Sequence, residues 1–404
     1  QFKDLVNDVV AAQLDEAPDS NEVREVTDAL QKSLADFHLT LAGNIGRKPW
    51  HEVVSVVKIE DQFDALCKSV NTLSDALLEL SDRGKELMRC AERCERIEKN
   101  LQIFSEETEG VINWLENFKL GFKLHSTPLV VADSFQAFMQ RYQCSWIFTS
   151  ATLAVNEKFD HFQQQLGLID AETIMLDSPY DYETNTRLYL PAINLEPNDK
   201  NYTVAVVDAV LPLLEVNQGR AFLLFTSHRA LRIAANHLQD HDDFALFVQG
   251  EAPRRELLSG FAKTEHAVLL GTSSFWEGVD IRGNALSCVV IDKLPFAAPD
   301  DPVLAGRLQA LRQTGANPFM AYQLPQAVIA LKQGVGRLMR DEEDYGVIVL
   351  CDPRLMSKPY GKTFIKSLPK IPLTSNLDNV INFLQLRETS SHNAQDRLNV
   401  STVN

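Results

Sequence analysis

Apolar residues in the first third of the chain recur at helical spacing. From Phe63 to Leu80 they stand at every third or fourth position: Phe63, Leu66, Val70, Leu73, Leu77 and Leu80. This spacing puts one apolar stripe along a helix and is typical of the seam of an antiparallel helix pair or coiled coil. The register continues more weakly through Leu87, Ala91, Cys94 and Leu101.

The length of this stripe predicts a long helix. A single helix over Asp61–Leu101 would be about 60 Å long, and Gly84 is the residue at which we expect a bend. The shorter amphipathic segment Glu22–Leu41 is its expected partner. Residues 1–125 are therefore predicted to form an all-helical domain with almost no strand.

The pattern changes in residues 126–169. Asp133 or Ser134 can cap a short helix, and the apolar run Trp146–Thr149 is predicted to be a buried strand. This strand ends in a Ser-Ala-Thr sequence that begins at Ser150. The segment is predicted to link the helical domain to a second domain that begins near Asp170.

From about Asp170 to residue 386, apolar strands alternate with helices. Helices are predicted at Tyr202–Val216, Ala230–Leu238 and Arg254–Phe261. The predicted strands are Ala221–Phe225, Ala245–Val248, Ala267–Leu270, Leu286–Ile291 and Val347–Leu350. This alternation predicts an α/β domain with a doubly wound parallel sheet.

Polar loops follow four of these strands: Thr226–His228, Gln249–Gly250, Gly271–Ser274 and Asp292–Lys293. The carboxyl ends of parallel strands meet at one edge of a sheet, where such folds bind ligands. We expect the four loops to converge there.

The last residues, 387–404, are polar and lack an apolar period, which predicts disorder. Just before them, four apolar residues (Val380, Ile381, Phe383 and Leu384) could instead form a docking helix.

Composition narrows the possible functions. The 404 residues are 45% apolar, which is enough for at least two cores. A net charge of −16 argues against a uniformly basic nucleic-acid coat, so any DNA contact must be a local groove. No apolar run approaches membrane-spanning length and the start does not resemble a signal peptide. Six irregularly spaced cysteines fit a reducing cytoplasm.

Two stretches carry candidate chemistry. In Ala327–Arg340, the side chains of Arg337 and Arg340 would share one helix face, and a guanidinium fork suits a phosphate. Gly336 in the same stretch would allow a close approach. The alternative is a solvated helix face, which is a common setting for such a pair of arginines.

The second stretch is Leu269–Gly283. A buried strand ends there in small hydroxyl residues, whose side chains and N–H groups suit a phosphate or nucleic-acid backbone. Glu277, Gly278 and Asp280 come next, in a turn. The alternative is an ordinary polar loop.

Taken in order, four stretches resemble motifs III to VI of superfamily 2 helicases, in particular the XPD/DinG-type iron–sulfur DNA helicases. They are Thr149–Leu153 (TSATL), Leu224–His228 (LFTSH), Gly271–Gly283 (GTSSFWEGVDIRG) and Gln333–Arg340 (QGVGRLMR). Ile291–Phe296 and Tyr360–Pro369 also look like family signatures. The resemblance spans about Thr127 to Pro369 and implies a RecA-like second motor domain preceded by an arch-type helical domain. It also implies that residues 126–169 are a remnant of the first motor domain and a linker.

The resemblance also implies roles at a nucleotide. Arg340 would be the arginine finger on the γ-phosphate, assisted by Arg337, and Gln333 would contact the phosphates. Asp280 would orient an arginine or meet the nucleotide, and Glu277 would position its loop. Gly278 and Gly336 complete the implied nucleotide-binding set, and no metal ligand is expected in this chain.

Other residues would contact DNA. The implied backbone contacts are Thr226, Ser227, His228, Thr272 and Ser273. Phe275 and Trp276 could stack on bases, although an aromatic residue beside a strand end is more often part of the core. Ser150 and Thr152 resemble residues that couple the phosphate state to the grip on DNA; the alternative is simply a hydroxyl-rich strand end.

One departure from the family matters more than the matches. The family's motor needs a Walker A loop and a DEAH box, and this chain has neither. Its one Gly-Lys-Thr, Gly361–Thr363, has Met356 where a phosphate-binding loop needs glycine. We therefore expect the C-terminal part of a helicase that does not hydrolyse ATP alone. The alternatives are a non-catalytic nucleic-acid-binding or regulatory module and a structural protein.

The resemblance implies ATP and Mg²⁺ as ligands shared with a first motor domain, and a [4Fe–4S] cluster outside this chain. Cys90 and Cys94 are not expected to hold that cluster, because Cys94 falls on the apolar seam and four thiolates are normally needed. The implied activity is 5′-to-3′ DNA unwinding in DNA repair or replication-fork rescue. The implied partners are single-stranded DNA or DNA junctions and the clamp-loader chi subunit.

Overall fold

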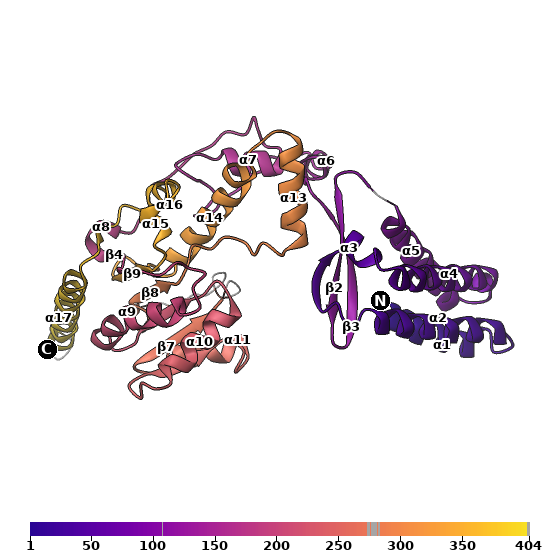
Figure 1. Ribbon diagram of the computed structural model, residues 1–404, viewed down its shortest axis with the longest axis horizontal. Coiled ribbons are helices and arrows are strands. Elements are labelled where there is room, and N and C mark those ends of the chain that lie inside the picture. The colour runs from indigo at the N-terminus through magenta and orange to yellow at the C-terminus, as the bar shows by residue number, and fades with distance from the viewer. Residues whose placement is uncertain (107, 273–274, 276–280, 282, 402–404) are drawn as a thin grey trace. The chain divides into compact units, whose positions relative to one another are not determined.

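The computed structural model describes residues 1–106, 108–272, 275, 281 and 283–401; the side chains of residue 284 and of residues 390–401 lie outside the description. Two compact units can be distinguished. The first unit comprises Gln1–Asp133 and Ala298–Pro318, and the second comprises Ser134–Ala297 and Phe319–Asn404 (Figure 1).

Helices form most of the first unit. They are α1 (Phe2–Glu16), α2 (Asn21–Thr40), α3 (Trp50–Val54), α4 (Val57–Leu80) and α5 (Lys85–Ser105), with a 3₁₀ turn at Ser81–Arg83. The predicted stripe is buried, and α4 packs against both α2 and α5. The partner helix expected at Glu22–Leu41 is therefore confirmed as α2.

The prediction of one helix over Asp61–Leu101 is wrong, because α4 ends at Leu80 and a separate helix, α5, begins at Lys85 (Figure 1). The carboxylate of Glu16 accepts hydrogen bonds from the N–H groups of Glu86 and Leu87 at 3.0 and 2.8 Å, which caps the start of α5. A Cβ atom on Gly84 would lie 2.0 Å from that carboxylate. The predicted bend residue is correct, but it separates two helices.

The first unit also contains a sheet, so the all-helical prediction is incomplete. Strands β1 (Gly46–Pro49), β2 (Val111–Phe118) and β3 (Gly121–Pro128) pair antiparallel in the order β1-β2-β3. Helix α13 (Pro302–Gln313) packs on β1 and β2. The sequence hides β2 because only Leu115 enters the helical core, whereas Trp114 stacks on His125 with 4.0 Å between ring centroids.

The second unit is built on a seven-stranded sheet. Its strands are β4 (Thr186–Tyr189), β5 (Ala221–Leu224), β6 (Ala245–Val248), β7 (Ala267–Gly271), β8 (Cys288–Ile291), β9 (Gly346–Leu350) and β10 (Leu373–Thr374). They pair parallel in the order β10-β4-β9-β8-β5-β7-β6. The predicted RecA-like doubly wound sheet is confirmed.

Helices cover both faces of this sheet. One core contains side chains of α9 (Tyr202–Val216), α10 (His228–Leu238) and α17 (Leu377–Ser401). The other contains side chains of α11 (Arg254–Phe261), α14 (Leu324–Val335), α15 (Arg354–Ser357) and α16 (Gly361–Ser367). Successive strand residues alternate between the two cores: Phe222 and Leu224 join one, Ala221 and Leu223 the other.

Three short helices precede the first strand of this sheet in the chain: α6 (Ala132–Gln140), α7 (Asp160–Leu166) and α8 (Tyr182–Asn185). The short helix expected here is confirmed as α6, but it begins at Ala132, so neither Asp133 nor Ser134 is its N-cap. The strand expected at Trp146–Thr149 is wrong: this run has no regular secondary structure, and Ile147 is 85% exposed. Among the described residues no strand lies beside the run to pair with it.

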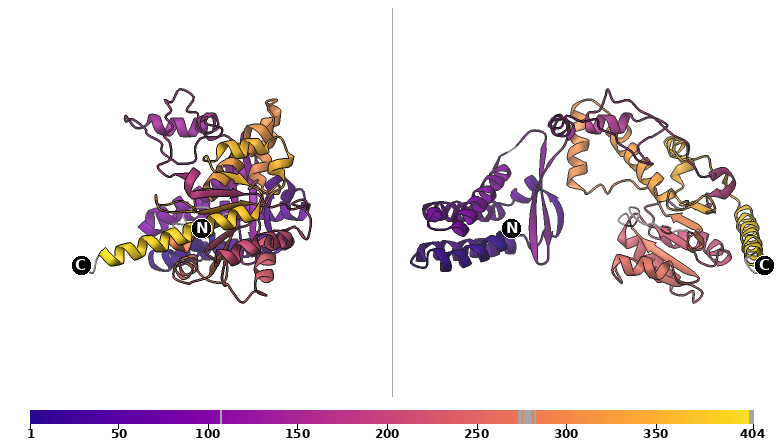
Figure 2. Two further views of the ribbon diagram at one scale, coloured as in Figure 1. Left: turned by 90° about the vertical axis from the view of Figure 1, so that its left-hand side faces the viewer. Right: turned by 180° about the vertical axis from the view of Figure 1, so that it is seen from behind.

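Helix α17 continues through Ser401, whereas the polar composition predicts disorder from residue 387. Its first turns bury Val380, Phe383 and Leu384 against the sheet and α9, as the docking-helix alternative expects. Adding residues to an anchored helix is easier than starting one. The C-terminal half of α17 projects away from the sheet (Figure 2).

Gly361 begins α16, and a Cβ atom there would lie 1.9 Å from the carbonyl oxygen of Leu355. The glycine is therefore explained by the close approach of α15 and α16, as expected for a helix start rather than a phosphate loop. Throughout the described part of the chain, no helix has the length and apolar character needed to cross a membrane.

Candidate functional site

The candidate site lies at the carboxyl edge of the seven-stranded sheet. Because the strands are parallel, the loops after β5, β7 and β8 leave the sheet at one edge. The N–H of Thr226 donates to Asp292 Oδ1 at 3.0 Å, which joins the loops after β5 and β8. The N–H of Thr272 donates to Gln249 Oε1 at 2.6 Å, which joins those after β7 and β6. The predicted convergence of the loops is confirmed.

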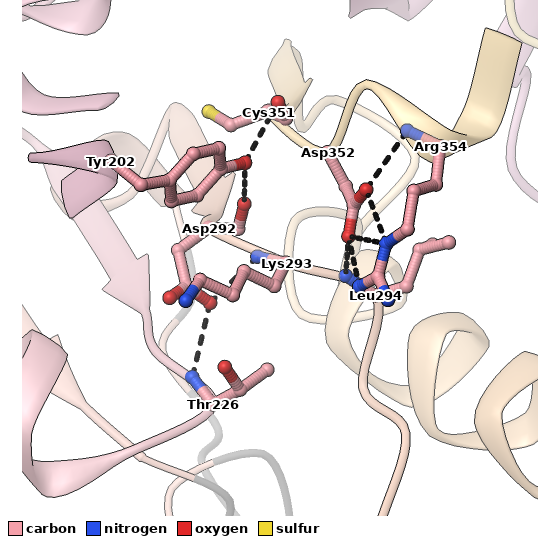
Figure 3. A network of polar contacts seen from close by, with 8 residues as sticks. All are labelled: Tyr202, Thr226, Asp292, Lys293, Leu294, Cys351, Asp352 and Arg354. Atoms are coloured by element: carbon pink, nitrogen blue, oxygen red, sulfur yellow. Dashed lines mark hydrogen bonds and ion pairs between the residues drawn. The ribbon is translucent and has the colours of Figure 1, made fainter. Parts of the chain in front are cut away.

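Asp292 organises one side of this edge (Figure 3). It is 1% exposed, and its Oδ1 also accepts the N–H of Lys293 at 2.7 Å. Its Oδ2 is buried and accepts no hydrogen bond from any described residue. Burial raises the pKa of Asp292 to about 7; the cation of Lys293 and the two N–H donors oppose the shift, and Asp352 adds to it.

Asp352 organises the other side, directly after β9 (Figure 3). Its Oδ2 accepts the N–H of Leu294 at 2.8 Å. The guanidinium of Arg354 binds both carboxylate oxygens, with Nε 2.9 Å from Oδ1 and Nη2 2.5 Å from Oδ2. The hydrogen bond from Leu294 therefore joins the chain just after β8 to the end of β9, and the ion pair with Arg354 holds the Asp352 carboxylate in place.

The hydroxyl of Tyr202 lies between these two strand ends. It is 2.9 Å from the carbonyl oxygen of Asp292 and 3.0 Å from that of Cys351, so its single proton is shared between two acceptors. Burial strongly raises the pKa of the Tyr202 hydroxyl, which keeps it a donor. Sequence reasoning missed Tyr202, Asp352 and Arg354. The available signal was that Asp352, like Asp292, is an aspartate within two residues of the end of a buried strand.

The residues predicted to contact DNA differ in accessibility. Thr226, Ser227 and His228 are exposed at the start of α10, where a ligand can reach them. Ser227 also accepts the N–H of Ala230 at 3.1 Å and thereby caps this helix. Thr272 is buried, and its hydroxyl lies 3.0 Å from Gln249 Oε1. It is placed to hold the edge together rather than to touch a ligand.

The residues predicted to contact nucleotide phosphates lie at and beyond the end of α14. Gln333 is on the helix, but the helix ends at Val335, so Arg337 and Arg340 lie in the turn beyond Gly336. The prediction that both arginines share one helix face is wrong, because the helix ends first. Both side chains are half-buried.

The backbone around Arg340 is held on both sides. Asp344 Oδ2 accepts the N–H groups of Arg340 and Asp341 at 2.7 and 2.8 Å. The hydroxyl of Tyr180 donates to the carbonyl oxygen of Arg340 at 3.1 Å. Burial raises the pKa of Tyr182 to about 12, and the Arg340 cation opposes that shift. The turn therefore presents Arg340 from a fixed backbone.

Comparison with known proteins identifies the type of chain. Residues 210–371 match the family model described as the helicase C-terminal domain. The chain is 41% identical over 387 residues to the ATP-dependent DNA helicase YoaA of Haemophilus influenzae, covering 95% of this chain and 60% of that protein. It is 31% identical over 340 residues to the 3′-5′ exonuclease DinG of Bacillus subtilis, covering 79% of this chain and 36% of that protein. Residues 210–371 therefore match a helicase C-terminal domain, and most of the chain is similar in sequence to helicases of the XPD/DinG type.

The sequence of Ala327–Leu355 predicts a YoaA-like member of the family. The greater identity of the chain to YoaA than to DinG agrees with this prediction. The solved structure of S. tokodaii Xpd4 has the same fold, with a TM-score of 0.55 at 14% identity over 92% of this chain and 70% of that one. The chain spans about 60% of the length of the curated YoaA relatives it matches.

Part of the predicted site lies outside the described residues: Ser273, Trp276, Glu277, Gly278 and Asp280. The neighbouring Phe275 is buried against Phe222, with 6.4 Å between ring centroids. Of the two interpretations of Phe275, the structure supports the core and not base stacking.

Ser150 and Thr152, the predicted coupling residues, form a local turn. Ser150 Oγ accepts the N–H of Thr152 at 3.2 Å, and the two hydroxyl oxygens are 3.4 Å apart. Ser150 is exposed and Thr152 half-buried. The turn therefore leaves at least one hydroxyl accessible.

The cysteines of α5 do not fit an iron–sulfur cluster. Cys94 is fully buried on the seam, its Sγ lies 3.6 Å from the carbonyl oxygen of Val70, and burial raises its pKa to about 12. A cluster ligand must be a thiolate, which this environment disfavours. Within the described residues, no group of three His, Cys, Asp or Glu side chains is placed to hold a metal.

The raised pKa of Asp292 makes a stability prediction. A carboxyl whose pKa is raised by folding contributes stability below its unfolded pKa, and this contribution is lost as the pH rises through the folded value. Asp292→Asn cannot ionise and keeps an acceptor for the two N–H groups. From about pH 5 to about pH 8, the wild-type chain should lose about 3 kcal/mol of unfolding free energy relative to this variant. The loss is about 1.4 kcal/mol per pH unit up to the folded pKa of about 7 and levels off above it.

The measurement is urea unfolding of both chains across that pH range. Asp240→Asn, at an exposed aspartate, is the control for the pH dependence that any aspartate-to-asparagine change produces in the free energy of unfolding. A wild-type-minus-variant difference that does not change with pH would show that Asp292 is already ionised in the folded chain at about pH 5.

Proposed function

We propose that this chain is the C-terminal part of an ATP-dependent 5′-to-3′ DNA helicase, acting in DNA repair or replication-fork rescue. The observation that carries the proposal is one edge of a RecA-like sheet on which the motif IV loop is exposed and pinned by Asp292. The identity to a protein named an ATP-dependent DNA helicase supports it.

Several residues of this chain would bind DNA or support the DNA-binding surface. Thr226, Ser227 and His228 would bind phosphate oxygens of single-stranded DNA or a DNA junction through hydroxyl, N–H and imidazole groups. Thr272 would position this surface from inside. Ser150 and Thr152 would couple it to the nucleotide. Ser273 and Trp276 belong to the same proposed surface.

At the nucleotide, the guanidinium of Arg340 would stabilise the charge that develops on the transferred phosphoryl group, with Arg337 beside it. Gln333, Gly336, Glu277, Gly278 and Asp280 complete the proposed site. ATP and Mg²⁺ would be held jointly with a first motor domain, and a [4Fe–4S] cluster would lie outside this chain.

We further propose that the protein works in the cytoplasm with the clamp-loader chi subunit as a partner of its C-terminal region. By itself, this 404-residue chain is expected to bind DNA without hydrolysing ATP.

DNA binding can be tested on this chain with a fluorescent single-stranded oligonucleotide. We expect weak binding that depends on salt. The logarithm of the association constant should fall linearly with the logarithm of the salt concentration, because phosphate contacts release counterions. Thr226→Ala with His228→Ala should weaken it, and His51→Ala, at an exposed histidine of the first unit, should not. Salt-independent binding, or equal affinity of both variants, would contradict the assignment.

A further inference from the structure

Lys332 makes a contact that no motif assignment explains. It lies on α14 immediately before Gln333, and its Nζ donates a hydrogen bond to the carbonyl oxygen of Ala154 at 2.9 Å. Ala154 is buried and comes two residues after Thr152. The contact thus joins two stretches that are separated by more than a third of the chain.

The setting of this amine strengthens the bond. The Lys332 side chain is half-buried, and burial lowers the pKa of its amine. A hydrogen bond from a cation is shorter and stronger than one between neutral groups, and it is stronger still where water is excluded. Its long apolar stem can also adjust to movement of either end.

Two further hydrogen bonds hold the residues just after Ala154. The N–H of Asn156 donates to Ser367 Oγ on α16 at 3.0 Å. Gln326 Nε2, on α14 six residues before Lys332, lies 2.9 Å from His161 Nε2 on α7. Residues 154–161 are therefore held against α14 and α16 by these three hydrogen bonds. Of the three, the bond from Lys332 is the nearest to Thr152 along the chain.

We propose that Lys332 is a positioning residue that ties the Ser150–Thr152 turn to the helix carrying Gln333. Gln333 and Lys332 are adjacent on one helix, so a displacement of Gln333 by a nucleotide moves the Lys332 amine. The amine moves the Ala154 carbonyl, and with it the turn. This inference rests on the proposed function, since it assigns Lys332 to the coupling between nucleotide and DNA.

The tether itself can be tested on this chain by amide hydrogen exchange. The amides of Val155 and Asn156 are useful reporters, because Val155 N–H donates to the Lys158 carbonyl at 2.9 Å and Asn156 N–H to Ser367. Lys332→Met keeps the apolar stem and removes the donor. It should accelerate exchange at both amides while the urea midpoint stays constant.

Lys366→Met, at an exposed lysine on α16, is the matched control, and Lys332→Arg should restore slow exchange. Unchanged exchange at Val155 and Asn156 in Lys332→Met would overturn the tether.

Coupling is tested in the full-length protein that contains this chain. In Lys332→Met the ratio of DNA-stimulated to basal ATP hydrolysis should fall about tenfold, with single-strand affinity nearly constant. Lys332→Arg should recover the ratio. An unchanged ratio would overturn the coupling role. Absence of ATPase from the wild-type protein would instead refute the proposed function, and the exchange result would still decide the tether.

Discussion

Arg340→Ala in the full-length protein is expected to lower DNA-stimulated ATP hydrolysis about a thousandfold, the usual worth of an arginine finger. Single-strand DNA affinity should stay close to wild type. The backbone of the turn is fixed by Asp344 and Tyr180, so truncating the side chain removes the guanidinium and leaves the turn in place. The measurement pairs a steady-state ATPase assay with DNA-binding titration.

Arg312→Ala, at an exposed arginine on α13, supplies the control for loss of a positive charge. ATPase near wild type in Arg340→Ala would remove the finger assignment. A parallel loss of DNA binding would show that Arg340 acts in the grip on DNA.

Asp352→Ala in this chain should lower the free energy of unfolding by about 3 kcal/mol, the cost of breaking a buried ion pair from one side. The variant leaves the half-buried guanidinium of Arg354 without its carboxylate and the N–H of Leu294 without its acceptor. The side chain of Arg354 is 26% exposed, so water compensates part of the loss.

The double variant Asp352→Ala with Arg354→Met separates pairing from packing. It should recover part of the stability, because no unpaired cation is left against Phe296, whose ring centroid lies 5.5 Å from the guanidinium carbon. Equal stability of Asp352→Ala and wild type in urea unfolding would show that neither the ion pair with Arg354 nor the hydrogen bond from Leu294 stabilises the fold.

The parallel sheet could be predicted from the sequence because its strands are buried on both faces. The strand Ala245–Val248 and the helices Tyr202–Val216 and Arg254–Phe261 match their predicted bounds residue for residue. The carboxyl edge can be derived from parallel topology, which requires the loops after Leu224 and Ile291 to meet.

The features that the sequence could not show depend on partners distant in the chain. The three-stranded sheet of the first unit is hidden because β2 buries few apolar side chains, and β1 lies more than 60 positions before it. Trp146–Thr149 has the composition of a strand but, among the described residues, no neighbour to pair with. The helix break at Gly84 depends on the carboxylate of Glu16, which no local pattern reveals.

The same holds for the candidate site. The apolar periodicity of α14 could not show that its helix ends before Arg337, because the pattern of apolar residues continues through Leu338 and Met339. The role of Lys332 depends on the carbonyl of Ala154, an atom that every residue possesses and that carries no sequence signature.

We propose above that this chain carries the second of the two motor domains that ATP hydrolysis requires. The most direct test compares ATP hydrolysis by the 404-residue chain and by the full-length protein, each with and without single-stranded DNA. We expect DNA-stimulated hydrolysis by the full-length protein and none by the chain, which should still bind DNA. Hydrolysis by the chain alone would show that this chain holds a complete ATPase site, and Gly361–Thr363 would then be the candidate phosphate-binding residues.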